Sequence, residues 1–149
     1  MDTSSSCSGW SIFIDGEYSN SGVINCKKIK NTQERLGIMC SALLSFLDQE
    51  NPDAVVIEMT VVSRNASAQR MLTMILGAVY GWCLVHNVYF EMLRPTEWRA
   101  LISKEKKGRK RDELKAWSVR KVKELFGIDV TDDESDAILI GLAYVKKYK

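Results

Sequence analysis

The sequence predicts an α/β fold in which helices flank a mixed five-stranded sheet. Residues 10–24 have the composition of two β-strands joined at the dipeptide Asp15-Gly16, which favours a tight hairpin. Two further strand-like runs, residues 55–58 and 88–93, alternate with long segments of helical periodicity. An antiparallel meander that continues into parallel strands with crossover helices gives a mixed sheet of this kind.

The first strand of this sheet is expected around Asp2, just before a turn of small polar residues at positions 3–9. Only Met1 precedes Asp2, so either this strand is short or further residues of the natural protein precede the numbering. The second strand is expected over residues 10–14 and the third over residues 17–24.

Helix-like segments follow, and turn residues indicate where they end. Asn51-Pro52 stops the first helix because proline cannot continue a helix, and Gly127 follows the third long one. A shorter helix with proline near its first turn is expected after the strand at residues 88–93. The long helices are expected over about residues 31–50, 66–86, 112–126 and from about 133 to near the C-terminus.

The composition indicates one globular domain covering residues 1–149. The chain is 46% hydrophobic, which is enough for a substantial core. No uninterrupted apolar run reaches the length of a membrane span, and the start does not resemble a signal peptide, so we expect a cytoplasmic protein. Its four cysteines are widely spaced and His86 is the sole histidine, which argues against a zinc site.

The segment from residue 66 to residue 86 is apolar on more than one face of the expected helix. A small domain cannot bury such a helix entirely, so a partner subunit is expected to cover part of it. Gly77 and Gly81 are four residues apart and would permit another helix to approach closely. We therefore predict a homodimer formed through this helix.

Charge is distributed unevenly along the chain. Residues 94–123 contain twelve Lys and Arg against four Asp and Glu, although the whole chain has a net charge of only +2. Such a segment is compatible with a solvated helix face and loop, and also with a site for a polyanion. A basic segment in the same small domain as a group of acidic residues favours the polyanion, because nucleases need both.

Four carboxylates are candidates for a metal site. Glu58 ends a strand that is expected to be buried on both faces, at the edge where α/β sheets bind ligands. Asp2 lies at a comparable turn, and Asp133 and Asp136 share one helical face because they are three residues apart. Each residue also has a structural explanation: the last two could interact with the helix dipole, Glu58 could pair with a lysine, and Asp2 could be a solvated terminus.

Three motifs resemble those of the RuvC family of Holliday-junction resolvases. In the first motif, Gly9 and Trp10 follow Asp2 at seven and eight residues. The second motif begins with Ile57-Glu58 and the third reads Asp133-Glu134-Ser135-Asp136-Ala137. After Glu58, the second motif continues with Asn65, Ala66 and Gly77. The order and separation of the motifs resemble those of a small, phage-type RuvC-like endonuclease that acts in a bacterium. Such an enzyme has a ribonuclease H-like fold.

The resemblance implies a homodimeric endonuclease that cuts branched DNA with Mg²⁺ or Mn²⁺, with two ions in each active site. Asp2 would bridge the ions, while Glu58 and Asp133 or Asp136 would each hold one ion. Hard divalent cations prefer such oxygen ligands, and two of them can activate a water and stabilise the leaving oxygen. The family register favours Asp136 over Asp133, because Asp136-Ala137 fixes the alignment.

The resemblance also implies a cation near the scissile phosphate. Lys110 is the first choice, and Arg109 and Arg111 compete with it because the length of the preceding gap is uncertain. Three other basic residues, Arg64, Lys106 and Lys107, are expected to contact backbone phosphates without reading the DNA sequence.

Val61 differs from the family pattern, in which an aromatic residue stands three positions after the motif glutamate and stacks at the junction centre. Because valine cannot stack in this way, we expect the chain to cut forks, flaps and other branched structures as well as four-way junctions.

Two alternatives to a nuclease are a noncatalytic DNA-binding or dimerisation domain derived from a nuclease, and a fragment of an actin-like ATPase. The ATPase would need a second glycine-rich phosphate loop, which the sequence lacks.

Overall fold

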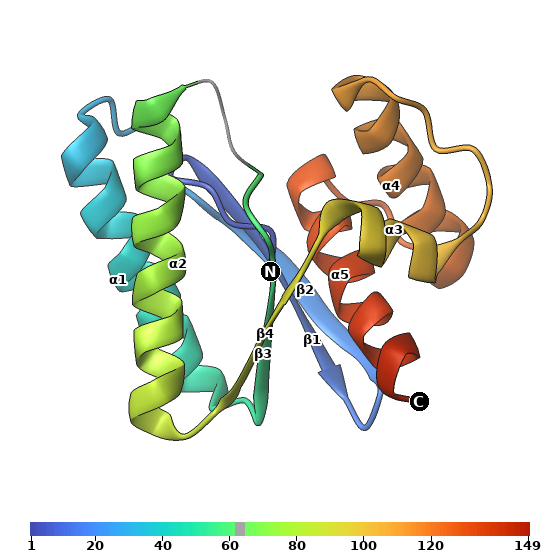
Figure 1. Cartoon of the computed structure of the whole chain (residues 1–149), viewed down its shortest axis with the longest axis horizontal. Coiled ribbons are helices and arrows are strands. Elements are labelled where there is room, and N and C mark those ends of the chain that lie inside the picture. The colour runs from blue at the N-terminus through green and yellow to red at the C-terminus, as the bar shows by residue number, and fades with distance from the viewer. Residues whose placement is uncertain (62–64) are drawn as a thin grey trace.

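The structure is a computed structural model that describes residues 1–61 and 65–149. Strands lie between two groups of helices (Figure 1), which gives the predicted α/β architecture. The elements are β1 (Cys7–Ile14), β2 (Glu17–Asn25), α1 (Thr32–Glu50), β3 (Ala54–Glu58), α2 (Ala66–His86), β4 (Tyr89–Leu93), α3 (Pro95–Ile102), α4 (Arg111–Phe126) and α5 (Asp132–Tyr148).

The predicted hairpin joins β1 and β2, which pair antiparallel with Ile14 opposite Glu17. Asp15 and Gly16 both have positive φ angles, of 52° and 84°, as a two-residue hairpin turn requires. The second pair, β3 and β4, is parallel, and its register aligns Glu58 with Leu93. The crossover between these parallel strands is α2, as the alternating pattern predicted.

The prediction of one five-stranded sheet was wrong. The described residues form two separate two-stranded sheets, β1–β2 and β3–β4. Residues 1 and 2 bridge them: Met1 O accepts from Glu58 N at 3.1 Å, and Asp2 N donates to Gly9 O at 3.0 Å. Asp2 therefore forms only an isolated bridge with Gly9, since two residues provide too few ladder hydrogen bonds for a strand.

Two apolar clusters cover opposite sides of the strands. Val55 and Ile57 of β3 pack in the cluster that includes α1 and α2, while Val56 packs with α3, α4 and α5. Figure 1 shows these two helix groups on either side of the strands. The apolar strand thus lies between the two helix layers, with Val55 and Ile57 buried and Val56 partly buried, and it ends at Glu58.

The helix α2 has the predicted bounds and is capped at both ends. Asn65 accepts a hydrogen bond from Ala68 N, and Asn87 ends the helix in the left-handed conformation. Contrary to the expectation from uninterrupted apolar runs, this described helix meets the length and mean hydropathy of a membrane span, a test that core helices also pass. One face packs in the core, and its buried residues are Ile75, Val79, Trp82 and Cys83.

Candidate metal and phosphate site

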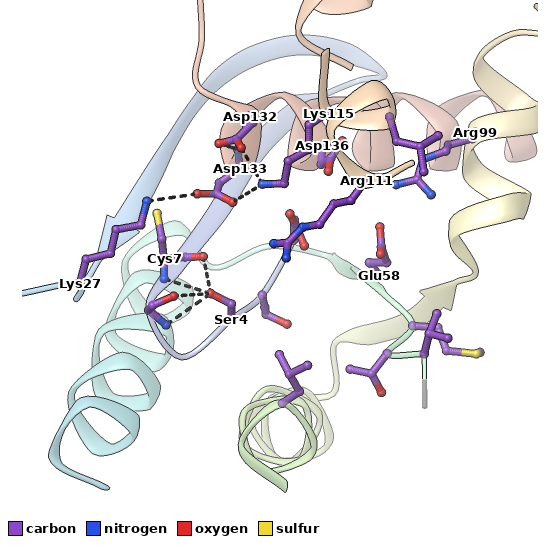
Figure 2. A pocket seen from close by; sticks show the side chains of 18 of the residues that line it. Ser4, Cys7, Lys27, Glu58, Arg99, Arg111, Lys115, Asp132, Asp133 and Asp136 are labelled. Carbon is purple, nitrogen blue, oxygen red and sulfur yellow. Dashed lines mark hydrogen bonds and ion pairs between the residues drawn. The ribbon is translucent and has the colours of Figure 1, made fainter. Parts of the chain in front are cut away.

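All four candidate carboxylates line one open cavity of about 680 Å³. The cavity lies where the start of the chain, the end of β3 and the first turns of α4 and α5 meet (Figure 2). The structure therefore brings together residues that are far apart in sequence: Asp2, Glu58, Asp133 and Asp136.

Gly9 brings the first turn of α5 close to Asp2. Its backbone exchanges two hydrogen bonds with Asp2, of 2.9 and 3.0 Å. A Cβ atom added to Gly9 would lie 2.0 Å from the backbone oxygen of Asp133. Only glycine permits this approach without a shift of the backbone, so the Gly9 of the first motif has a direct structural role.

Glu58 is held in place by a tryptophan from α3. Trp98 Nε1 donates a hydrogen bond of 2.8 Å to Glu58 Oε2, and the Trp98 side chain is fully buried. Burial raises the pKa of Glu58, and the Trp98 hydrogen bond and the Arg99 charge act in the opposite direction. Sequence reasoning missed Trp98, because nothing in the spacing of residues 58 and 98 links them.

Asp136 is buried at the cavity without a complete set of hydrogen bonds. It is 7% exposed, and its Oδ1 atom has no hydrogen-bond partner of normal geometry among residues 1–61 and 65–149. Burial raises the pKa of Asp136, and the nearby Ser118 hydroxyl lowers it only in part. A buried carboxylate oxygen left unpaired is costly unless a cation or a proton joins it.

Asp2 has the most perturbed carboxyl group of the cavity. Burial, followed by the charges of Asp136 and Glu58, raises the pKa of Asp2 to about 8. Mutual repulsion of this kind shows that three acidic side chains from distant segments influence one another.

Their oxygen atoms are the donor type that Mg²⁺ and Mn²⁺ prefer, so the residues fit a divalent cation. As the side chains lie, no three His, Cys, Asp or Glu groups in the described chain are arranged to hold one metal, so binding would require side-chain rotation.

Asp133 differs from the other three carboxylates because two lysines form ion pairs with it. Lys115 Nζ lies 3.4 Å from Asp133 Oδ1, and Lys27 Nζ lies 3.9 Å from Asp133 Oδ2. Lys115 also forms a closer ion pair, of 2.6 Å, with Asp132. Figure 2 shows the two lysines approaching Asp133 from opposite sides.

The basic residues of the cavity are only partly those expected from the sequence. Arg109 and Arg111 line it, whereas within the described chain Lys110, Lys106 and Lys107 are not among its lining residues. Lys110 instead precedes α4, and its backbone N–H donates to Glu113. Arg64 lies outside the described residues.

Sequence reasoning missed Arg99, Lys27 and Lys115, which also line the cavity. One signal could have identified Lys115: it follows Arg111 by four residues and so shares its face of α4. Arg99 and Lys27 carry no such signal, because tertiary packing alone brings α3 and the end of β2 to the site.

The raised pKa of Asp2 predicts how the stability of the metal-free protein depends on pH. The folded state keeps the Asp2 proton up to about pH 8, whereas the unfolded chain loses it near pH 4. Stability due to this group is therefore lost as pH rises through that interval. The Met1 amino group, whose pKa burial lowers to about 6, acts in the opposite direction above pH 6.

We therefore expect Asp2→Asn to be more stable than the wild type at pH 7, with the difference shrinking toward pH 4. Urea unfolding of both proteins in EDTA at several pH values measures this difference. An equal difference at pH 4 and pH 7 would contradict the assignment of a buried, repelled carboxyl group to Asp2.

No protein-family profile matches the chain. In sequence it is similar to the crossover junction endodeoxyribonuclease RuvC of Chlorobium chlorochromatii (strain CaD3), with 28% identity over 121 residues. That similarity covers 81% of this chain and 62% of the relative. The chain thus spans less than two thirds of the length of the curated relative that it matches.

Solved structures of RuvC from Thermus thermophilus share the fold. The structure of that RuvC in complex with a Holliday junction substrate superposes with a TM-score of 0.77 at 16% identity, covering 99% of this chain and 90% of the other. A second structure of the Thermus protein gives a TM-score of 0.70 at 16% identity, with 99% and 92% covered. The chain is therefore RuvC-like, both in its sequence and in its fold.

Proposed function

We propose that the chain is a metal-dependent endodeoxyribonuclease that cuts phosphodiester bonds in branched DNA. The observation that carries the proposal is the convergence of Asp2, Glu58 and Asp136 on one cavity, where burial and mutual repulsion raise their pKa values. Basic side chains line the same cavity and would offset the charge of a phosphate. The similarity to RuvC, and the solved complex of that relative with a Holliday junction, support branched DNA as the substrate.

In this proposal each side chain has a separate task. Asp2, Glu58, Asp133 and Asp136 would hold the cations, and Trp98 fixes the orientation of Glu58 through its hydrogen bond. When bound, two Mg²⁺ or Mn²⁺ ions would supply an activated water and stabilise the leaving oxygen. Arg111, which extends into the cavity in Figure 2, would position and neutralise the scissile phosphate.

Nicking of labelled branched DNA with and without EDTA tests the enzyme against the alternative of a noncatalytic DNA-binding domain. We expect nicking that requires Mg²⁺ or Mn²⁺ and is lost in Asp136→Asn, with DNA binding retained. Binding without any metal-dependent nicking would favour the noncatalytic alternative.

The choice of branch is a separate prediction that concerns Val61, an exposed residue that lines the cavity. Valine offers no ring to stack at a junction centre, so we expect no strong preference for a four-way junction. Forks and flaps should be nicked at rates within about tenfold of a four-way junction, a ratio that corresponds to about 1.4 kcal/mol. A strong preference for the four-way junction would contradict this prediction.

DNA affinity should depend on the arginines at the cavity more than on the lysines of the preceding loop. Each phosphate contact contributes about 0.9 to the slope of log affinity against log salt. Arg109→Gln with Arg111→Gln should therefore flatten the slope by about 2, while Lys106→Gln with Lys107→Gln should flatten it less. Binding titrations at several salt concentrations measure the slopes, and equal slopes for the two double variants would contradict the assignment.

The exposed side of α2 is proposed as the contact with a second copy of the chain. Met74 and Leu84 are 58% and 63% exposed, although both are large and apolar. Gly77 and Gly81 lie on the same side, and a Cβ atom added to either would meet nothing within 4 Å. A stripe of small residues flanked by apolar ones suits a close helix–helix contact, which buries area that water would otherwise cover.

Gly81→Arg should therefore convert a dimer into a monomer, because a buried unpaired charge would lie at the contact. Sedimentation velocity measures the change. Ser45→Arg provides the control, since Ser45 is exposed on the other helix of this layer, α1. A wild-type chain that remains monomeric at high concentration would contradict the dimer.

A further inference from the structure

We propose that Lys115 is a positioning residue that makes the two cation positions of the site unequal. In this inference, which rests on the proposed nuclease function, Asp2, Glu58 and Asp136 would hold the first cation. Asp133 would become a ligand of the second cation only when it is released from the Lys115 ammonium group. Lys115 thus acts as a built-in competitor for the second metal ion.

The Lys115 ammonium group is held between two carboxylates at the start of α5. It lies 2.6 Å from Asp132 Oδ2 and 3.4 Å from Asp133 Oδ1, and its side chain is only 23% exposed. The Lys115 ammonium group is therefore held in ion pairs with both carboxylates.

Asp132 serves as the anchor for Lys115 and is not itself available to a metal. Its Oδ1 atom accepts the backbone N–H of Asp133 at 2.9 Å, and its Oδ2 atom accepts from Lys115. Both oxygens are thus engaged within the chain. Asp133, by contrast, is bound at the longer distances of 3.4 and 3.9 Å, so it is the easier of the two carboxylates to release.

The other three carboxylates have no such competitor. Within residues 1–61 and 65–149, Asp2, Glu58 and Asp136 form no ion pair with a lysine or arginine at 4 Å or less. Asp136 Oδ1 is buried and lacks a hydrogen-bond partner in the same part of the chain. These oxygens can receive a cation without displacing an ammonium group, whereas those of Asp133 cannot.

Whether loss of Lys115 strengthens or weakens cation binding at the second site distinguishes a competing role for Lys115 from a purely structural one. If Lys115 only orients the acidic turn, its loss should disorder Asp133 and weaken the second cation site. If Lys115 competes for Asp133, its loss should strengthen that site, because a dication no longer has to displace a positive charge. Neighbouring groups of this kind change metal affinity by about 10–100-fold.

The test is a titration of the full chain with Mn²⁺ in the absence of DNA, followed by calorimetry and by electron paramagnetic resonance of free Mn²⁺. We expect two unequal sites in the wild type. Lys115→Met, which keeps the apolar stem, should tighten the weaker site by about tenfold and leave the stronger site unchanged. Asp132→Asn should weaken that same site, since Lys115 then has only Asp133 as its partner.

Lys121→Met is the matched control. Lys121 is also on α4 and pairs with Glu105 and Glu124, but it lies outside the cavity lining among the described residues. Its substitution should alter neither site. A weaker or unchanged second site in Lys115→Met would overturn the inference and leave the nuclease proposal intact. No Mn²⁺ binding to the wild type would overturn both.

Discussion

Asp136→Asn is expected to abolish cleavage of branched DNA and, at the same time, to raise the melting temperature of the metal-free protein. Asparagine keeps the shape of the side chain but removes a buried negative charge that raises the pKa of Asp2. Metal-assisted stabilisation of the reaction is worth several kcal/mol, so the nicking rate should fall by about a thousandfold or more. Greater stability together with lost activity is typical of a strained functional site.

Thermal unfolding in EDTA and nicking in Mg²⁺ measure the two effects on the same protein. Addition of Mg²⁺ should raise the melting temperature of the wild type and not that of Asp136→Asn, because only a bound cation stabilises the folded state. Asp129→Asn is the control, since Asp129 is exposed in the turn before α5. A lower melting temperature for Asp136→Asn in EDTA would show that the carboxylate is structural.

Gly9→Ala is expected to have the second large effect, on both stability and metal binding. The added methyl group would meet the backbone of Asp133, which can move only if α5 moves. Overpacking of this kind costs about 1–3 kcal/mol. For a domain of this size, each kcal/mol lowers the melting temperature by about 2–4 °C. The displaced helix would also carry Asp133 and Asp136 away from Asp2.

Gly37→Ala provides a matched control for the added methyl group. Gly37 lies within α1, and an added Cβ atom would meet nothing within 4 Å. Its replacement should stabilise the helix by up to about 1 kcal/mol, because alanine is the better helix former. Differential scanning calorimetry of the two variants compares them directly. Equal melting temperatures would mean that α5 does not pack on Gly9 as closely as the structure has it.

Local patterns in the sequence predicted most of the elements. The turn at Asp15-Gly16 was correct because positive φ angles are a local requirement, which these residues satisfy cheaply. The bounds of α2 were correct because Asn65 and Asn87 cap a continuous apolar helix. The shared cavity of Asp2, Glu58 and the two aspartates of α5 was expected from sheet geometry and from the family resemblance.

Long-range contacts limited the rest of the prediction. The five-stranded sheet failed because residues 1 and 2 form only isolated backbone hydrogen bonds, Met1 with Glu58 and Asp2 with Gly9, and do not join the two sheets as a strand. Of the basic residues expected at the site, only Arg109 and Arg111 line the cavity among the described residues, for a related reason. A loop of high charge from Lys104 to Lys110 is visible in sequence, but which of its residues reaches the carboxylates depends on how α4 packs on α5.

The central claim is that carboxylates from three distant segments form one cation site. The most direct measurement is anomalous X-ray scattering from crystals of the full chain soaked in Mn²⁺. We predict a Mn²⁺ peak within ligand distance of Asp2, Glu58 and Asp136, about 2.0–2.6 Å from their oxygens. A peak elsewhere with these carboxylates unliganded, or Glu58 more than about 10 Å from both aspartates, would contradict the proposed chemistry.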